Sequence, residues 1–238
     1  MNHLIIIHWA DSFLNQEDYH WFLRESYVPR YATPWEDKEK PDYKKSIAIK
    51  WKNNGGTVWY PSLPNKQNAR YHDWKIVFEW ILSQLNEIDE VTFIWGSLGG
   101  CFLLKYFSEM ETSSFVIPTK SLSRAKRGKE SIINNQSRSF VPQDDKKWNS
   151  LRISQIHLVA ACISEWDFSA QTNYESLQQL GNRVHIWHAK DDKVVPFSVG
   201  QDLSKILPNA HTHFFSSDKW YGHFHGVEKF PELEEILI

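Results

Sequence analysis

Short apolar runs alternate with longer segments of helical periodicity along this chain. Brief apolar runs between turn residues are typical of buried strands, whereas apolar residues at every third or fourth position predict amphipathic helices. The runs predict strands over residues 3–8, 57–60, 91–95, 156–162, 184–188 and 211–215. The helical pattern covers residues 17–27, 73–86, 101–107 and 199–207. This alternation favours an α/β fold, a three-layer sandwich with a mostly parallel central sheet between helices.

Two segments interrupt this alternation, at about residues 29–54 and 109–149. The first is rich in Lys, Asp, Glu and Pro, and the second carries SLSRAKRGKE and NNQSRS with little periodicity. We interpret both as insertions into a single domain that spans residues 1–238. The basic excess at residues 120–129 suits an anionic partner, but a solvated charged face is the interpretation that we favour.

A predicted strand runs directly into a predicted helix at residues 91–107, with Ser97 at the turn between them. Hydrolases that use a serine nucleophile place it on such a strained turn, where small neighbouring residues let the strand and the helix approach. Gly96, Gly99 and Gly100 supply small residues here. Ser97 is therefore a candidate nucleophile, and a plain helix-capping serine is the alternative.

A serine nucleophile needs a base and an acidic group that orients this base. Asp192 and His223 each follow a predicted strand, in the order Ser, Asp, His that α/β hydrolases use. Asp191 and His225 are the alternatives. We favour His223, because only one of two histidines on the same face of an extended segment lies at the depth of Ser97.

Paired histidines at 211 and 213, and at 223 and 225, also suit metal ligands. No cysteine or carboxylate cluster completes such a site, so we predict no metal.

The chain resembles the small serine hydrolases of the α/β-hydrolase superfamily typified by YdeN and retinoblastoma-binding protein 9. The matching segments are HLIIIHWADS, YHWFLRE, TVWYPSLPN, WGSLGGCFLLKYFSE, IHLVAAC, HAKDDKVVPF and YGHFHG. They cover most of the chain outside the two insertions, and their order is more specific than any one of them. The resemblance implies an α/β-hydrolase-like fold and a carboxylesterase-like serine hydrolase that cleaves a small ester, or an amide or thioester, without a cofactor.

Carried over residue by residue, the resemblance makes Ser97 the nucleophile that forms an acyl-enzyme, His223 the base and Asp192 its orienting acid. The spacing of Asp192 to the following proline matches the family, which favours it over Asp191. The backbone N–H groups of Leu98 and Ala10 would hold the oxyanion.

We expect a shallow, open substrate site around these residues. Its substrate-binding residues would be Trp9, Ser12, Phe13 and Trp166, and it would be bordered by Pro64, Asn65 and Phe168. Both insertions follow a helix and precede a strand, so we expect them at the opposite edge of the sheet, far from Ser97. Neither insertion is therefore predicted to be a lid.

Tryptophan stands where the family has glycine at three positions, Trp9, Trp95 and Trp220. The chain has 12 tryptophans and 10 glycines, which is a raised and a lowered count. An indole at 95 is expected to crowd the turn. One hypothesis is that these three residues are glycines in the native protein. Some bacterial lineages read the codon UGA as glycine and others as tryptophan, so translation with the wrong code would write tryptophan for glycine. The codons at the three positions test this hypothesis, and UGG at all three would refute it.

The alternative is that these tryptophans are genuine, as Trp21 and Trp74 are expected to be at amphipathic-helix positions. A genuine Trp95 would favour a rival function, a catalytically inactive hydrolase fold that binds a protein partner.

Composition and charge indicate which partners and which cellular compartment to expect. The chain has 27 Lys and Arg against 29 Asp and Glu, a formal charge of −2, which argues against a nucleic-acid partner. No stretch approaches a membrane span or forms a signal-peptide core, so we expect a cytoplasmic protein without a membrane partner. Cys101 and Cys162 lie in apolar runs, which predicts small buried thiols in a reducing compartment rather than a disulfide framework or a zinc site.

Overall fold

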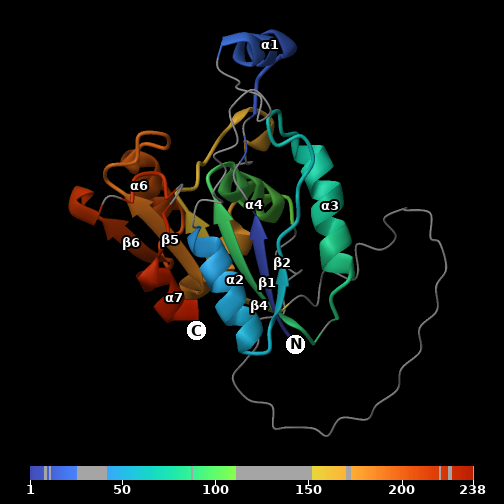
Figure 1. Ribbon diagram of the computed structural model, residues 1–238, viewed down its shortest axis with the longest axis vertical. Helices are drawn as coiled ribbons and strands as arrows, with labels where there is room; N and C mark the ends of the chain where they lie inside the picture. The colour runs from blue at the N-terminus through green and yellow to red at the C-terminus, as the bar shows by residue number, and fades with distance from the viewer. Residues whose placement is uncertain are drawn as a thin grey trace, which may run out of the picture.

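The computed structural model describes residues 1–7, 10, 12–25, 42–86, 88–110, 152–169, 173–219, 221–224 and 227–237. Within these residues, six parallel strands form one sheet in the order β2-β1-β3-β4-β5-β6 (Figure 1). The strands are β1 Asn2–Ile7, β2 Thr57–Trp59, β3 Glu90–Gly96, β4 Arg152–Val159, β5 Val184–Ala189 and β6 His211–Phe215. Every predicted strand is present, although β4 begins four residues before its predicted start at residue 156.

The sheet is most deeply buried at its centre. In β1 and β3, the residues from His3 to Ile7 and from Val91 to Gly96 are all buried, because helices cover both faces of a parallel sheet. By contrast, β6 pairs only with β5, and its residues are exposed or half-buried. Gly96 of β3 pairs with Val159 of β4, so the carboxyl ends of these two strands lie level.

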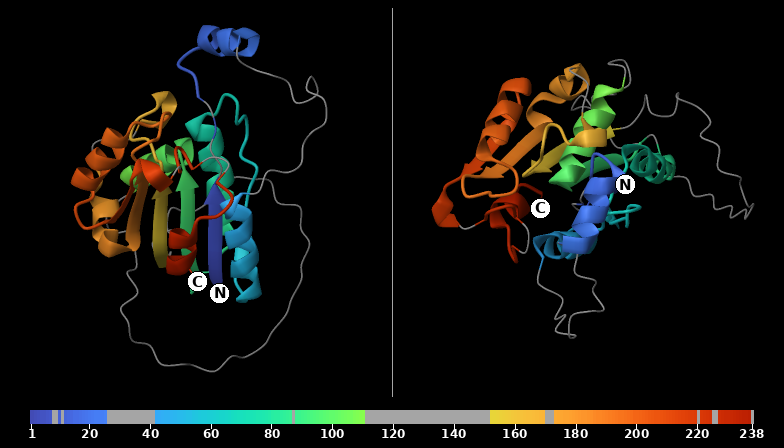
Figure 2. Two further views of the ribbon diagram at one scale, coloured as in Figure 1. Left: turned by 60° about the vertical axis from the view of Figure 1, so that its left-hand side comes forward. Right: turned by 90° about the horizontal axis from the view of Figure 1, so that it is seen from above.

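Helices cover both faces of the sheet, which confirms the predicted three-layer α/β sandwich (Figure 2). One face carries α3 Tyr71–Ser83, α4 Leu98–Ser108, α5 Glu175–Leu180 and α6 Phe197–Ile206. The other carries α2 Tyr43–Asn53 and α7 Pro231–Leu237. Three short 3-10 helices complete the described elements: η4 Trp166–Phe168, η5 Gly181–Arg183 and η6 Ser217–Lys219. None of the described helices is long and apolar enough to cross a membrane.

The helix that connects β1 to β2 along the sheet is not the predicted one. The helix predicted at residues 17–27 is α1 Gln16–Glu25, which lies beyond the carboxyl edge of the sheet and covers neither face (Figure 1). Instead α2, inside the segment interpreted as an insertion, packs on the sheet through Tyr43 and Ile47.

A helix between two parallel strands runs opposite to them, so its N-terminus lies near their carboxyl ends. The prediction that residues 29–54 lie far from Ser97 is therefore wrong for Tyr43 and Lys44 at the start of α2, which line a cavity with Ser97. The end of α2 lies at the opposite edge, where Trp51 Nε1 donates to the carbonyl of Asn2 at the beginning of β1. The second predicted insertion falls mostly outside the described residues, as do its basic residues 120–129.

Trp95, where the sequence predicts crowding, is fully buried in β3. Its indole stacks on Phe102 of α4, with ring centroids 5.1 Å apart and planes at 8°, and meets Phe78 of α3 edge-on at 5.1 Å. The side chain therefore fills space between the sheet and two helices. Within the described residues, its indole nitrogen has no hydrogen-bond partner. Trp9 and Trp220 lie outside the described residues.

Candidate active site

Ser97 connects β3 to α4 in a strained backbone conformation. Its φ of 53° and ψ of −125° place it in a region that residues other than glycine rarely adopt. The turn is held on both sides: the Ser97 N–H donates to the Val159 carbonyl at 3.0 Å, and the Ser97 carbonyl accepts from Gly100 N–H at 2.9 Å. Such a turn lifts the serine side chain out of the sheet at the start of a helix.

Gly100 is the glycine that this turn requires. A Cβ added there would lie 2.2 Å from the Cβ of Ala161, closer than real Cβ atoms approach. A Cβ on Gly96 would meet only the Val159 carbonyl oxygen, at an ordinary 3.5 Å. The start of α4 therefore packs so closely on the chain after β4 that position 100 has no room for a side chain.

Asp192 and His223 meet beside this turn. His223 Nδ1 lies 2.9 Å from Asp192 Oδ2 and 3.1 Å from Oδ1. Because an ionised carboxylate only accepts hydrogen bonds, this ring nitrogen carries the proton and Nε2 is left as the acceptor. Asp192 Oδ1 also accepts the N–H groups of Val194 at 2.8 Å and Val195 at 2.9 Å.

These contacts favour the charged form of Asp192. Burial alone would raise its pKa, but the hydrogen bonds from His223 and from the Val195 and Val194 N–H groups outweigh burial and lower the pKa below its usual value. The carboxylate is therefore ionised at neutral pH and able to hold the imidazole in one orientation.

Asp191 has a different role from its neighbour. Its Oδ2 accepts the Gly222 N–H at 3.2 Å. Gly222 and Phe224, on either side of His223, both have positive φ, at 49° and 58°. Asp191 therefore supports the loop that presents the histidine, whereas Asp192 contacts the histidine itself. His225 lies outside the described residues.

Ser97 and His223 line the same small cavity, together with Tyr43 and Lys44 at the start of α2. Lys44 is buried, and burial lowers the pKa of its ammonium, partly offset by the charge of Asp42. Tyr43 and Lys44 could not be recognised from the sequence, because the lysine-rich composition of their segment is typical of an insertion.

The residues predicted to hold the oxyanion follow β3 and β1, which pair side by side in the sheet. Leu98 is the first residue of α4, where a backbone N–H has no partner within the helix. Ala10 follows β1, is half-buried and packs against the core on the α3 and α4 face.

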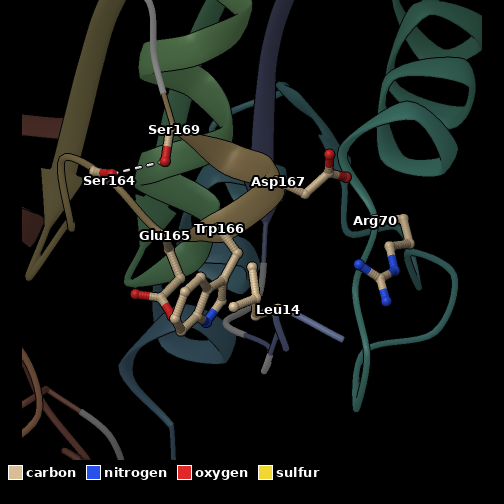
Figure 3. A pocket seen from close by; sticks show the side chains of 7 residues that line it. All are labelled: Leu14, Arg70, Ser164, Glu165, Trp166, Asp167 and Ser169. Atoms are coloured by element: carbon tan, nitrogen blue, oxygen red, sulfur yellow. Dashed lines mark hydrogen bonds between the residues drawn. The ribbon is translucent and has the colours of Figure 1, made fainter. Parts of the chain in front are cut away.

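A larger pocket of about 490 Å³ lies among the loops that follow β1, β2 and β4. It is lined by Leu14, Arg70, Ser164, Glu165, Trp166, Asp167 and Ser169 (Figure 3). Figure 3 shows the Arg70 guanidinium across from the indole of Trp166, which is 49% exposed. Among the predicted substrate-binding residues that the structure describes, Trp166 lines this pocket, whereas Ser12 and Phe13 do not.

The other residues predicted to bind the substrate or to border its site lie in different surroundings. Ser12 Oγ donates to the Ala69 carbonyl at 3.2 Å, and Arg70 Nη1 donates to the Phe13 carbonyl at 3.3 Å, so both residues anchor the loop next to the pocket. Trp9 lies outside the described residues. Phe168 does not border an open site: it is fully buried, because its ring packs edge-on against Trp74 in the core.

His211 and His213 belong to a stacked aromatic cluster on the α7 face. The His213 ring stacks on Trp187 at 3.7 Å, and His213 Nε2 lies 3.1 Å from His185 Nδ1. The buried His157 accepts a hydrogen bond from Trp187 Nε1 at 3.1 Å. In the part of the chain that the structure describes, no three His, Cys, Asp or Glu side chains are grouped to hold a metal ion.

This histidine cluster predicts a loss of stability in mild acid. Burial, then the charge of His213, lowers the pKa of His185 to about 4, and burial also lowers that of His157. The unfolded chain, with histidine pKa values near 6.5, binds more protons, so the free energy of unfolding falls as pH drops from about 7 to about 4. In His185→Gln this fall is expected to be smaller by about 1–2 kcal/mol.

Urea unfolding at several pH values measures this difference. His72→Gln, at a solvent-exposed position of α3, is the matched control and is expected to keep the slope of the parent chain. Equal slopes in all three proteins would contradict the prediction.

The chain is similar in structure to α/β hydrolases over nearly its whole length. The ydeN gene product of B. subtilis gives a TM-score of 0.59 at 15% identity, covering 99% of this chain and 96% of that chain. A structure from work on carboxylesterases of the thaumarchaeon Nitrososphaera gargenis gives a TM-score of 0.50 at 11% identity, covering 99% and 88%. No family model and no curated protein sequence matches the chain. The predicted α/β-hydrolase fold and the resemblance to YdeN are thus confirmed in the structure.

Proposed function

We propose that this chain, which has the α/β-hydrolase fold, is a cofactor-independent serine hydrolase that cleaves ester bonds of small molecules. Ser97 is the nucleophile, His223 the general base, and Asp192 the residue that orients the base. The observation that carries the proposal is the pair of hydrogen bonds from His223 to Asp192, next to a strained Ser97 that lines the same cavity as the histidine.

The reaction proceeds through an acyl-enzyme. His223 Nε2 takes the proton of Ser97 Oγ as this oxygen attacks the ester carbonyl, and the charge of Asp192 stabilises the imidazolium that forms. The N–H groups of Leu98 and Ala10 stabilise the oxyanion. The imidazolium then protonates the leaving alcohol, and a water molecule activated by the same histidine releases the acid.

The substrate occupies the larger pocket. Ligands of parallel α/β sheets bind in crevices beyond the carboxyl ends of the strands, and the loops around this pocket follow β1, β2 and β4, which flank or lie near β3. Its exposed indole at Trp166 offers an apolar surface for an acyl or alcohol group. The other substrate-binding residues that we propose are Trp9, Ser12 and Phe13.

Trp95 does not favour the rival function, a catalytically inactive fold that binds a protein. Its side chain packs between β3, α3 and α4, and the strained conformation of Ser97 is present with the indole in place. A bulky residue at this position is therefore compatible with a working nucleophile.

A fluorophosphonate probe tests the proposal, because it reacts with activated serines. We expect stoichiometric labelling at Ser97 in the parent chain, and its loss in both Ser97→Ala and His223→Ala. Ser204→Ala, which removes a hydroxyl on α6, is the control that keeps labelling. A folded parent chain that stays unlabelled, or labelling that persists in Ser97→Ala, would overturn the assignment.

A further inference from the structure

The two cysteines converge behind the turn that carries Ser97. Cys101 lies in α4, and its backbone N–H donates to the Ser97 carbonyl at 3.3 Å. Cys162 follows β4, and its Sγ donates to the same oxygen at 3.7 Å. The residues that precede them, Gly100 and Ala161, are in the closest backbone approach of this turn. Both cysteines therefore contact the same Ser97 carbonyl, from α4 on one side and from the chain after β4 on the other.

The two sulfurs differ in access. Cys101 is buried, whereas Cys162 is half-buried, and both are free thiols. Burial, and next the neighbouring thiol of Cys162, raises the pKa of Cys101 well above its usual value, so it is protonated at neutral pH. A small solute from solvent therefore reaches Cys162 first and finds Cys101 directly behind it.

We propose that Cys101 and Cys162 form a reversible disulfide in response to a hydroperoxide, and that this bond disables the turn that carries Ser97. Thiol pairs that oxidise in a reducing compartment are typically transient and regulatory rather than structural. The sequence predicted small buried thiols in a reducing compartment, and their convergence on the Ser97 carbonyl is what the sequence does not show.

The oxidation balances with hydrogen peroxide as the oxidant. Cys162 Sγ attacks one peroxide oxygen: an S–O bond forms, the O–O bond breaks, and the thiol proton leaves with the other oxygen as water. Cys101 Sγ then attacks the sulfenic sulfur: the S–S bond forms, the S–O bond breaks, and hydroxide leaves with the Cys101 proton as a second water. Two thiols are oxidised and one peroxide is reduced.

The disulfide acts on the site in two ways. Cys162 loses the proton that it donates to the Ser97 carbonyl. Closing the S–S bond also fixes the separation of the two cysteine Cβ atoms, which displaces the chain that leads, two and four residues later, to Ser164 and Trp166 at the rim of the larger pocket (Figure 3). Only this effect on activity rests on the proposed function, whereas formation of the disulfide does not.

Two readouts on the full chain test the proposal. The reduced protein is treated with hydrogen peroxide, its intact mass is recorded, and the rate of fluorophosphonate labelling is measured before and after reduction with dithiothreitol. We expect the loss of two hydrogen masses, one bond between the two cysteine peptides, and labelling slowed by about ten- to a hundredfold, with recovery on reduction. Cys101→Ser and Cys162→Ser, each compared with its own reduced form, are expected to keep their labelling rates.

Several outcomes would overturn the proposal. These are two thiols that still react with iodoacetamide after peroxide, a disulfide that links two chains, and a bond within the chain that leaves labelling unchanged. Slower labelling of the parent chain without the disulfide would overturn it as well. Absent labelling of the reduced protein would count against the proposed function instead, because the mass measurement decides the disulfide separately.

Discussion

Replacing Asp192 by asparagine is expected to lower kcat/KM for a small ester by about 10³- to 10⁴-fold. The amide oxygen of asparagine still accepts the N–H groups of Val194 and Val195, so the loop keeps its shape. Facing His223, however, the amide has lost a charge and carries an N–H group, which favours the imidazole tautomer with the proton on Nε2. That nitrogen then no longer accepts the proton of Ser97.

Asp191→Asn is the matched control for this substitution. It changes the adjacent carboxylate in the same way, yet Asp191 accepts only the Gly222 N–H among the described contacts. We expect it to lower kcat/KM by no more than about tenfold, because the amide oxygen of asparagine still accepts the Gly222 N–H and only the charge is lost. Hydrolysis of a chromogenic acetate ester measures both variants, and equal losses would refute the assignment of Asp192.

Replacing Trp95 by glycine is expected to lower the free energy of unfolding by about 3–5 kcal/mol. The indole is fully buried and is packed against Phe78 and Phe102, so its removal leaves a cavity between β3 and two helices. Glycine also costs backbone entropy in a strand. The indole nitrogen has no described partner, and its removal offsets only part of this loss, about 1–3 kcal/mol at most.

Urea unfolding of Trp95→Gly measures this loss. Trp80→Gly, at a position of α3 that is 45% exposed, separates the cost of glycine from the cost of a cavity and is expected to lose about 1–2 kcal/mol. If Trp95→Gly is as stable as the parent chain and Ser97 reacts faster, the packing argument is wrong and the hypothesis of a glycine written as tryptophan is favoured. Glycine replacements at Trp9 and Trp220 extend the same comparison.

The strands could be predicted because their signal is local. Each buried strand of the sheet is a short apolar run, and β6 has the predicted bounds. The crossover helix α2 escaped prediction because its apolar residues Tyr43 and Ile47 are interleaved with lysines, one of which, Lys44, is itself buried. Such a narrow row of apolar residues can be recognised as the buried face of a helix only when the sheet that it covers is known.

The proximity of the candidate site residues could be predicted from their order and spacing, since Ser97, Asp192 and His223 each follow a strand of a parallel sheet. The neighbours of Ser97 could not. Whether an indole fits at position 95 depends on how β3 faces α3 and α4. The convergence of Cys101 and Cys162 on the Ser97 carbonyl depends on the pairing of β3 with β4. Both depend on contacts between residues that are far apart in the sequence, and a local sequence pattern does not predict such contacts.

The half-exposed edge strand β6 determines how the candidate site would lose its geometry as denaturant is added. Asp192 and His223 follow β5 and β6 at the edge of the sheet, whereas Ser97 follows β3 at its buried centre. Edge elements open at a lower free energy than buried central ones and exchange their amide protons sooner. Partial opening of β6 would carry the histidine away from a serine that stays in place, so inactivation is expected at lower denaturant concentrations than the melting of the central strands.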